Sequence, residues 1–248
     1  MIMGLFLTLA FLFCIGSLIG WCIEVVFRRF FSAANPERKW INPGALAGPY
    51  LPLYGFGLCI LFLLASLEDH IWIENPIWNK MLMFSAMAVC MTVIEYIAGI
   101  LSIKMANVRL WDYSGQWGNI QGIICPKYSL IWALLGAVYY FLIHSHILGA
   151  LEWLSQNLAF SFAIGMFYGV FLIDVVYTAQ IIQKIKKFAE DNHVVVKYEN
   201  LKHQVRSFQD QNSQKPHFFF PLRSERPLAE HLKDMIPTQT HSKIRKKK

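Results

Sequence analysis

The chain has 248 residues, of which 55% are hydrophobic and 16% are charged. Soluble domains average about 45–50% apolar and about 25% charged residues, so the composition excludes a water-soluble domain of ordinary make-up and favours a chain that faces lipid. The charge is unevenly divided. Residues 1–181 carry eight of the 23 lysines and arginines, and residues 182–248 carry fifteen. We therefore predict a transmembrane domain over 1–181 followed by a basic tail in water.

Five stretches are long and apolar enough to cross a membrane, which takes about 20 residues for about 30 Å of hydrocarbon. The first lacks the basic start of a signal peptide and is too long for one, so we expect it to remain as an uncleaved span. The fold class predicted is an all-α, polytopic helical membrane protein. Its spans are Met3–Phe27, Leu46–Leu67, Met81–Ile103, Ile124–Ile143 and Leu158–Ile182.

The second of these spans begins in a segment rich in helix breakers. Between Asn42 and Gly57 the sequence reads NPGALAGPYLPLYGFG. Irregular backbone is tolerated at membrane depth only where protein or a water-filled cavity satisfies it. The pattern therefore predicts either a broken helix or a short re-entrant entry followed by the span itself.

The loops between the predicted spans indicate how the chain is oriented. With alternating spans, 22 of the 23 basic residues fall on one side, and the two loops on the other side contain only Lys80. Loops rich in lysine and arginine stay in the cytoplasm. We therefore predict an outside N-terminus and a cytoplasmic C-terminus.

The tail divides into two predicted parts. Residues 182–211 alternate apolar and charged side chains, which favours a cytoplasmic amphipathic helix that continues the fifth span. Residues 212–248 are polar, proline-punctuated and end in KIRKKK, which predicts a disordered basic tail. That end could contact anionic membrane lipid or serve only to solubilise the chain. No nucleic-acid-binding fold is indicated.

Cysteines and histidines give no sign of a metal site or a bound cofactor. The five cysteines lie in or beside apolar runs with no CxxC spacing, and we interpret them as small buried hydrophobes. His144 and His146 form a short motif on the predicted outer side with too few neighbours to hold a metal. We expect both to be exposed loop residues.

Three carboxylates lie within predicted spans, where ionisable groups are expensive and often functional. Glu24, Glu95 and Asp174 all fall toward the cytoplasmic ends of their spans. Each could instead be a packing carboxylate paired with an arginine or a tyrosine hydroxyl, a reading that we favour for Asp174. For Glu24 and Glu95 both interpretations stay open.

The predicted cytoplasmic edge carries more polar and aromatic side chains than an anchor needs. Residues 109–122 read RLWDYSGQWGNIQG, and their aromatics suit the headgroup level of a membrane. The alternative is a structured loop that folds back over Glu24 and Glu95 and covers a pocket open to the cytoplasm. The candidate pocket residues are Glu24, Asn42, Tyr50, Tyr54, Glu95, Trp111, Asp112, Tyr113, Asn119 and Gln121.

Several ordered motifs resemble those of one family. Gly20-Trp21-Cys22-Ile23-Glu24 resembles its G-W-x-x-E element, and the segment from Asn42 to Gly57 resembles its N-x-G…G-P-Y-x-P-x-Y-G-x-G element. The stretch running from Glu95 and Gly99 through the WDYS motif to Asn119 and Gly122 resembles its E-x-x-x-G…W-D-Y-S…N-x-x-G element. On these residues, about 5–145 of the chain is similar to the bacterial putative ABC-transporter type IV family (putative ABC transporter permease).

The resemblance implies a permease-like subunit in the inner membrane of a bacterium that works with a separate ATP-binding subunit, and dimers could supply further spans. At Pro43 the family pattern commonly has arginine, which removes one candidate charge beside the pocket. The tail after Ile182 lies outside the resemblance. The chain contains no GxxxxGK[ST], HExxH or GxSxG motif, so it has no ATPase site of its own.

Three functions remain open from the sequence. The first is a transport subunit, since carboxylates beside a broken helix suit a substrate or ion site. The second is a membrane-embedded enzyme acting on a lipid-linked substrate, with Glu24, Glu95 and Asp112 as acid–base candidates. The third is a scaffold that recruits partners through its tail.

Overall fold

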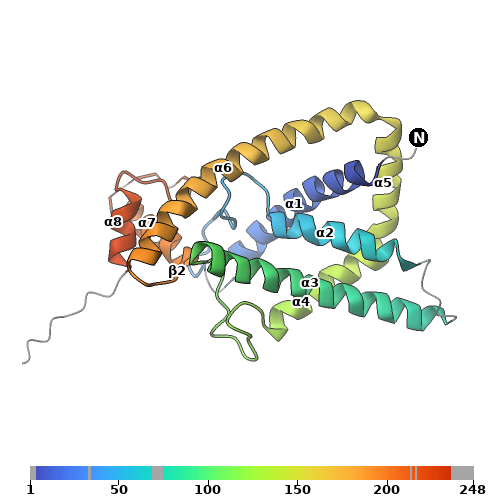
Figure 1. Ribbon diagram of the computed structural model, residues 1–248, viewed down its shortest axis with the longest axis horizontal. Helices are drawn as coiled ribbons and strands as arrows, with labels where there is room; N and C mark the ends of the chain where they lie inside the picture. The colour runs from blue at the N-terminus through green and yellow to red at the C-terminus, as the bar shows by residue number, and fades with distance from the viewer. Residues whose placement is uncertain (1–3, 33–34, 69–74, 213, 216, 236–248) are drawn as a thin grey trace, which may run out of the picture.

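The computed structural model describes residues 4–32, 35–68, 75–212, 214–215 and 217–235, and the described chain is mostly helical (Figure 1). In chain order its elements are α1 (Leu5–Phe30), α2 (Pro52–Ala65), α3 (Pro76–Ala106), β1 (Val108–Arg109), α4 (Pro126–Val138), the π-helical turn η2 (Tyr139–Ile143), α5 (His144–Gln156), the 3-10 turn η3 (Leu158–Phe160), α6 (Ser161–Asp191), β2 (Val196–Lys197), α7 (Tyr198–Gln211) and α8 (Leu228–Asp234).

Four helical segments of the described chain are long and apolar enough to span a membrane, so this is a multi-pass membrane protein. They are Leu5–Phe30, Pro76–Ala106, Pro126–Gln156 and Ser161–Asp191. The second predicted span differs from these. Only its later part is helical, as the 14 residues of α2, which extend about 21 Å at 1.5 Å per residue.

The irregular segment before α2 lies beside α1 within the apolar part of the molecule. The backbone N–H of Leu51 donates to the carbonyl of Ser17 at 3.0 Å, and the Cys59 thiol donates to the carbonyl of Leu9 at 3.3 Å. Thus α2 runs antiparallel to α1 and starts partway along it. Of the two predicted alternatives, the structure has an irregular segment followed by a single short helix rather than a helix broken in two.

Prolines set the starts of three membrane helices. Pro52, Pro76 and Pro126 each occupy the first turn of α2, α3 and α4, where the missing N–H costs nothing and φ is already helical. Asn75 also caps α3, because its side chain accepts a hydrogen bond from the N–H of Ile77 at 2.9 Å.

The fourth span does not end at Ile143 as predicted. The chain passes through the π-helical turn η2 and continues as α5 over His144–Gln156. Helices bend at such turns, and Figure 1 shows α5 leaving the direction of α4. The prediction of a loop at 144–155 is therefore wrong. His144, the first residue of α5, shares a hydrogen bond of 2.8 Å with the hydroxyl of Tyr139 in η2.

A hydrophobic core lies at the end of the molecule that contains the C-terminal part of α6, together with α7 and α8. We call this end the tail side. β1, which directly follows α3, pairs in parallel with β2 so that Val108 lies opposite Val196. The core around them joins the C-terminal part of α6 to α7 and α8, and its members include Val108, Ile185, Leu201, Val205 and Leu232. We call residues 182–235 the tail domain.

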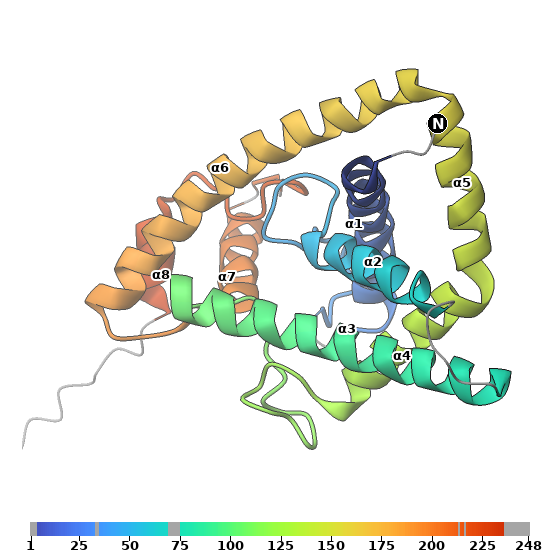
Figure 2. The ribbon, with the colours of Figure 1, turned by 45° about the vertical axis from the view of Figure 1, so that its right-hand side comes forward.

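The tail domain corrects two predicted boundaries. α6 continues without interruption from Ser161 to Asp191, and α7 is a separate helix, so 182–211 is not a single amphipathic helix. Within the predicted disordered segment 212–248, α8 forms over Leu228–Asp234 and buries His231 and Leu232. Residues 236–248 lie outside the described part. Figure 2 shows α6 separated from α3 along most of its length and approaching it at the tail domain.

Candidate functional site

Glu24 on α1 and Tyr54 on α2 form the first part of the candidate site. Tyr54 donates its hydroxyl to Glu24 Oε2 at 3.0 Å. This contact depends on Gly20, one turn before Glu24, because a Cβ there would lie 2.2 Å from Cβ and Cγ of Tyr54. The G-W-x-x-E motif therefore has a physical reading: glycine admits the tyrosine ring, and the glutamate one turn later receives its hydroxyl.

Glu24 also belongs to a line of mostly buried charges that reaches the tail domain. Arg28 donates to Glu24 Oε1 at 3.0 Å and contacts Glu199 on α7 at 2.9 Å. Lys202 contacts the same Glu199 oxygen at 2.9 Å. Two cations and two carboxylates thus alternate from α1 into α7. We call these four residues the charge line.

The local environment sets how the tail-domain members of the charge line ionise. Burial by itself would raise the pKa of Glu199, but Arg28 and Lys202 outweigh burial and hold that pKa below its ordinary value. Burial lowers the pKa of Lys202, and Glu199 offsets this only in part. The pairing therefore favours a charged Glu199.

Asn42 organises the irregular segment that precedes α2. Its Oδ1 accepts from the Trp21 indole at 3.0 Å and from the N–H of Gly44 at 3.3 Å, and its Nδ2 donates to the carbonyls of Leu46 and Ala47 at 3.0 and 3.1 Å. One buried amide thus satisfies three groups of this turn and the Trp21 indole on α1, as buried irregular backbone requires.

Asp174 holds the other side of the same segment. Its carboxylate accepts from the N–H groups of Ala47 and Gly48 at 3.1 and 2.7 Å, and from the Tyr50 hydroxyl at 2.7 Å. Thr178 supplies a further hydrogen bond at 3.1 Å. The packing interpretation that the sequence favours for Asp174 agrees with this arrangement, and Tyr50 contacts Asp174 rather than Glu24 or Glu95.

Glu95 on α3 forms the second part of the candidate site. Its side chain is 2% exposed, and Oε1 accepts from the Tyr113 hydroxyl at 3.1 Å. The Trp132 indole is close by, yet among the described residues Oε2 makes no hydrogen bond of normal geometry. Tyr113 stacks on Tyr128, with ring centroids 4.2 Å apart.

Gly99, one turn after Glu95, makes room for the loop that supplies Tyr113. A Cβ at Gly99 would lie 2.3 Å from Cγ2 of Ile123 and 3.3 Å from the Trp111 ring. Trp111 is fixed there because its indole donates to the carbonyl of Ile123 at 2.8 Å. The loop therefore folds back onto α3, as the structured-loop alternative requires.

The other predicted loop residues hold the loop itself together. Asn119 donates to the carbonyls of Ser114 and Gln116 and accepts from the N–H of Gly122 at 2.9 Å. Gln121 has an exposed side chain and a left-handed φ of 54°, and its carbonyl accepts from Arg109 at 2.9 Å. Neither side chain is directed at Glu95.

Asp112 links the loop to the tail domain. Its Oδ2 contacts Lys197 on β2 at 2.6 Å, and its Oδ1 accepts from the N–H of Ser114 at 3.0 Å. Burial opposes ionisation, but Lys197 and Ser114 outweigh it and lower the pKa of Asp112 to about 2. A carboxylate so strongly held in its charged form is poorly suited to donate a proton near neutral pH.

The structure thus brings together four of the ten predicted site residues. Glu24 with Tyr54 and Glu95 with Tyr113 are near neighbours, and Tyr54 joins the two pairs because its ring lies 4.9 Å from that of Trp132. The sequence did not indicate Arg28, Tyr128, Trp132, Glu199 or Lys202. The four-residue spacing from Glu24 to Arg28 could have suggested the first of these.

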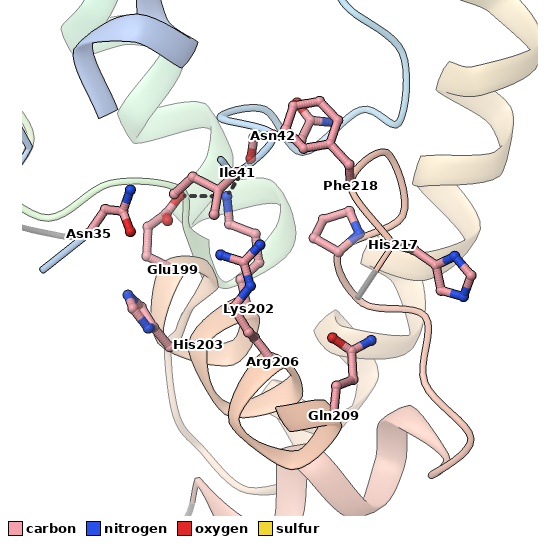
Figure 3. A pocket seen from close by; sticks show the side chains of 11 residues that line it. Asn35, Ile41, Asn42, Glu199, Lys202, His203, Arg206, Gln209, His217 and Phe218 are labelled. Atoms are coloured by element: carbon pink, nitrogen blue, oxygen red, sulfur yellow. Dashed lines mark hydrogen bonds and ion pairs between the residues drawn. The ribbon is translucent and has the colours of Figure 1, made fainter. Parts of the chain in front are cut away.

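A cavity of about 30 Å³ lies beside this site, next to α7 (Figure 3). Asn42 is the predicted site residue that lines it, together with Glu199, Lys202 and Arg206. The predicted pocket between Glu24, Glu95 and the loop is occupied by the tyrosine and tryptophan rings described above. Within the described residues, no group of three His, Cys, Asp or Glu side chains could hold a metal ion.

The fold and the site define a multi-pass helical membrane protein with linked buried carboxylates toward one end. Comparison with known families identifies it further: residues 11–179 match the model of the Putative ABC-transporter type IV family, and the chain belongs to that family. Searches of curated proteins and of solved structures found no match.

Proposed function

We propose that this chain is the permease-like membrane subunit of an ABC transporter in the inner membrane of a bacterium. In this proposal the N-terminus lies outside, the tail domain lies in the cytoplasm, and a separate subunit hydrolyses ATP. Membership of the family supports the transport role, and the gathering of basic residues at the tail side supports the orientation.

The observation that carries the proposed site is the buried carboxylate of Glu95. One of its oxygens is held by Tyr113, and the other has no hydrogen-bond partner of normal geometry among the described residues. A buried carboxylate oxygen is costly unless something donates to it. We assign to Glu95 the role of contacting a cationic or hydrogen-bond-donating group of the transported solute, or a coupling ion.

Discontinuous helices beside carboxylates are the usual setting of such sites in transporters. Here the irregular segment Asn42–Leu51 and the short helix α2 lie against α1, and Tyr54 on α2 reaches the Glu24 carboxylate. Movement of α2 would therefore change both carboxylate clusters together. This coupling is the feature that favours transport over a static anchor.

The partner is tested by purifying the full chain from native membranes in a mild detergent and assaying for an ATP-binding subunit. Co-purification of a protein that binds and hydrolyses ATP is expected. Recovery of the chain alone, together with unchanged solute uptake in a deletion strain, would contradict the proposal.

The site is tested in the same purified complex. Glu95→Gln is expected to lower its ATP turnover about tenfold or more, since hydrogen bonds to charged groups contribute about 1.5–3 kcal/mol. Glu152→Gln, an exposed glutamate on α5, is the matched control and should leave turnover unchanged. Equal turnover in both variants would show that Glu95 is not part of the transport site. It would leave the association with an ATP-binding subunit untouched.

A further inference from the structure

The loop His217–Pro221 of the tail domain carries three consecutive phenylalanines that touch two membrane helices. Phe218 and Phe219 lie against Trp21 on α1, with ring centroids 6.0 and 6.4 Å apart. Phe220 lies against Tyr177 on α6 at 5.8 Å. The loop therefore bridges α1 and α6, which are far apart in sequence.

The position of this loop along the two helices can be measured from the first basic residue on each helix. Trp21 precedes Arg28 by seven residues, and Tyr177 precedes Lys184 by seven residues. Seven residues of α-helix rise about 10 Å, so on both helices the aromatic contacts lie about 10 Å along the axis before the first lysine or arginine. Phe219 and Phe220 remain 44% and 38% exposed there.

Directly beside the loop is the cavity of about 30 Å³, large enough for roughly two water-sized groups. Its walls are formed by His217 and Phe218 on one side and by Lys202, His203 and Arg206 on the other (Figure 3). The carboxylate on this cavity, Glu199, is already paired with Arg28 and Lys202. Besides Lys202, the lysine or arginine on the described cavity wall is Arg206.

Arg206 is placed to accept an anion. It donates to the carbonyl of Trp40 at 3.2 Å, and burial lowers its pKa although Asp210 and Glu37 partly offset this effect. An anion in the cavity would offset the remaining cost of burying this charge. Trp40 itself is 52% exposed and stacks under Arg29 at 5.2 Å, an arrangement typical of the headgroup level of a membrane.

We propose that the cavity binds the phosphate headgroup of an anionic phospholipid, with Arg206 contacting the headgroup and Phe219 and Phe220 contacting its acyl chains. The chemistry recognised is a phosphate group next to an apolar chain. Free phosphate shares the first feature and lacks the second, and the exposed rings of Phe219 and Phe220, which follow Phe218 of the cavity wall in the chain, favour the lipid. A bound lipid would join the tail domain to the membrane between α1 and α6.

The test uses native mass spectrometry on the purified full chain, titrated with phosphatidylglycerol and phosphatidylcholine that carry the same acyl chains. Wild-type protein should bind phosphatidylglycerol more tightly. Arg206→Gln should weaken that binding about fivefold, the effect of about one basic residue near a charged lipid surface, and leave phosphatidylcholine binding unchanged. Lys233→Gln, an exposed lysine on α8, is the charge-matched control and should behave as wild type.

Two further arms separate the sources of phosphate. Phe219→Ser should weaken the binding of both lipids, because it removes an acyl-chain contact and no charge. Millimolar inorganic phosphate should not displace phosphatidylglycerol, and displacement at low millimolar concentration would overturn the lipid assignment. A salt series on the wild-type protein does not depend on whether a variant folds. Raising the salt concentration should weaken phosphatidylglycerol binding. Equal affinity for the two lipids, or no salt dependence, would overturn the proposal.

Discussion

The clusters around Glu24 and Glu95 are built from the same parts. In each, a glutamate on a membrane helix accepts a hydrogen bond from a tyrosine hydroxyl, Tyr54 in one case and Tyr113 in the other. In each, a glycine one helical turn away gives space to the segment that carries or supports that tyrosine. The two motifs read G-x-x-x-E and E-x-x-x-G and place the glycine on opposite sides of the acid.

The clusters differ in what compensates the carboxylate. Arg28 binds Glu24 and continues into the tail domain through Glu199 and Lys202. Glu95 has the Tyr113 hydroxyl on one oxygen and no normal hydrogen bond on the other within the described chain. Glu24 is thus joined to the tail domain through Arg28, whereas Glu95 has one oxygen without a normal hydrogen bond, the feature on which the proposed transport site rests.

The largest effect is expected where the charge line crosses from α1 to α7. Glu199→Gln leaves two buried cations with one carboxylate, and removing one partner of a buried pair costs about 3–5 kcal/mol. Thermal unfolding in detergent measures the loss. Glu190→Gln removes an exposed pair with Lys186 and should cost less than about 1 kcal/mol. Equal shifts in the two variants would mean that the charge line does not hold the tail domain.

A smaller loss is expected from Gly20→Val at the α1–α2 contact. The added Cβ would overlap the Tyr54 ring, and overpacking typically costs about 1–3 kcal/mol. The matched control is Gly165→Val on α6, where nothing lies within 4 Å of the added Cβ. If both substitutions lower the unfolding midpoint equally, the close contact between Gly20 and Tyr54 does not stabilise the Glu24 cluster.

Tyr113→Phe sharpens the contrast at Glu95. The substitution keeps the stack on Tyr128 and removes the hydrogen bond to Glu95, and leaving a buried acceptor without its donor costs about 1–3 kcal/mol. We expect a lower unfolding midpoint than in Tyr96→Phe, at the residue next to Glu95 on α3. In the double variant Tyr113→Phe with Glu95→Gln the two losses should not add, because both remove the same contact. Additive losses would show that Tyr113 and Glu95 act separately.

The smallest effect is expected from mild acid. The pKa of Glu199 lies below its ordinary value of 4.5 in the folded protein, so its stabilising contribution is complete above that value and is lost as the pH falls through the folded pKa. Unfolding midpoints should therefore change little through this residue between pH 7 and pH 5 and fall below about pH 4.5. In Glu199→Gln the acid-dependent loss should be smaller, and an unchanged loss would assign it to other carboxylates.

Much of the membrane fold could be predicted from hydrophobic length alone. Four of the five predicted spans overlap helices long enough to cross a bilayer, and the irregular entry to the second was indicated by its glycines and prolines. The bend after Val138 could not be predicted, because the η2 sequence YYFLI contains no proline or glycine to mark it. The same is true of α8, whose stability depends on the burial of Leu232 against the tail core.

The site was predicted in part for a similar reason. Glu24, Tyr54, Glu95 and Tyr113 were recognisable because charged groups within apolar spans and aromatic residues beside them are unusual. Glu199 and Lys202 lie in a polar segment, where two more charges carry no signal. Their role depends on the ion pairs that Glu199 forms with Arg28 and Lys202. A sequence of alternating charges does not show which of its side chains are buried.

The sequence by itself determined that this is a multi-pass helical membrane protein with acidic groups toward one end, because lipid demands long apolar helices and makes each interior charge conspicuous. Only the tertiary structure decided which group donates hydrogen bonds or supplies positive charge to each of these carboxylates. Arg28 turns toward Glu24 and Glu199, Tyr113 turns toward Glu95, and Asp174 turns toward the N–H groups of Ala47 and Gly48. Those partners are separated by up to 171 positions in the chain, and their pairing depends on how the helices pack rather than on any local pattern.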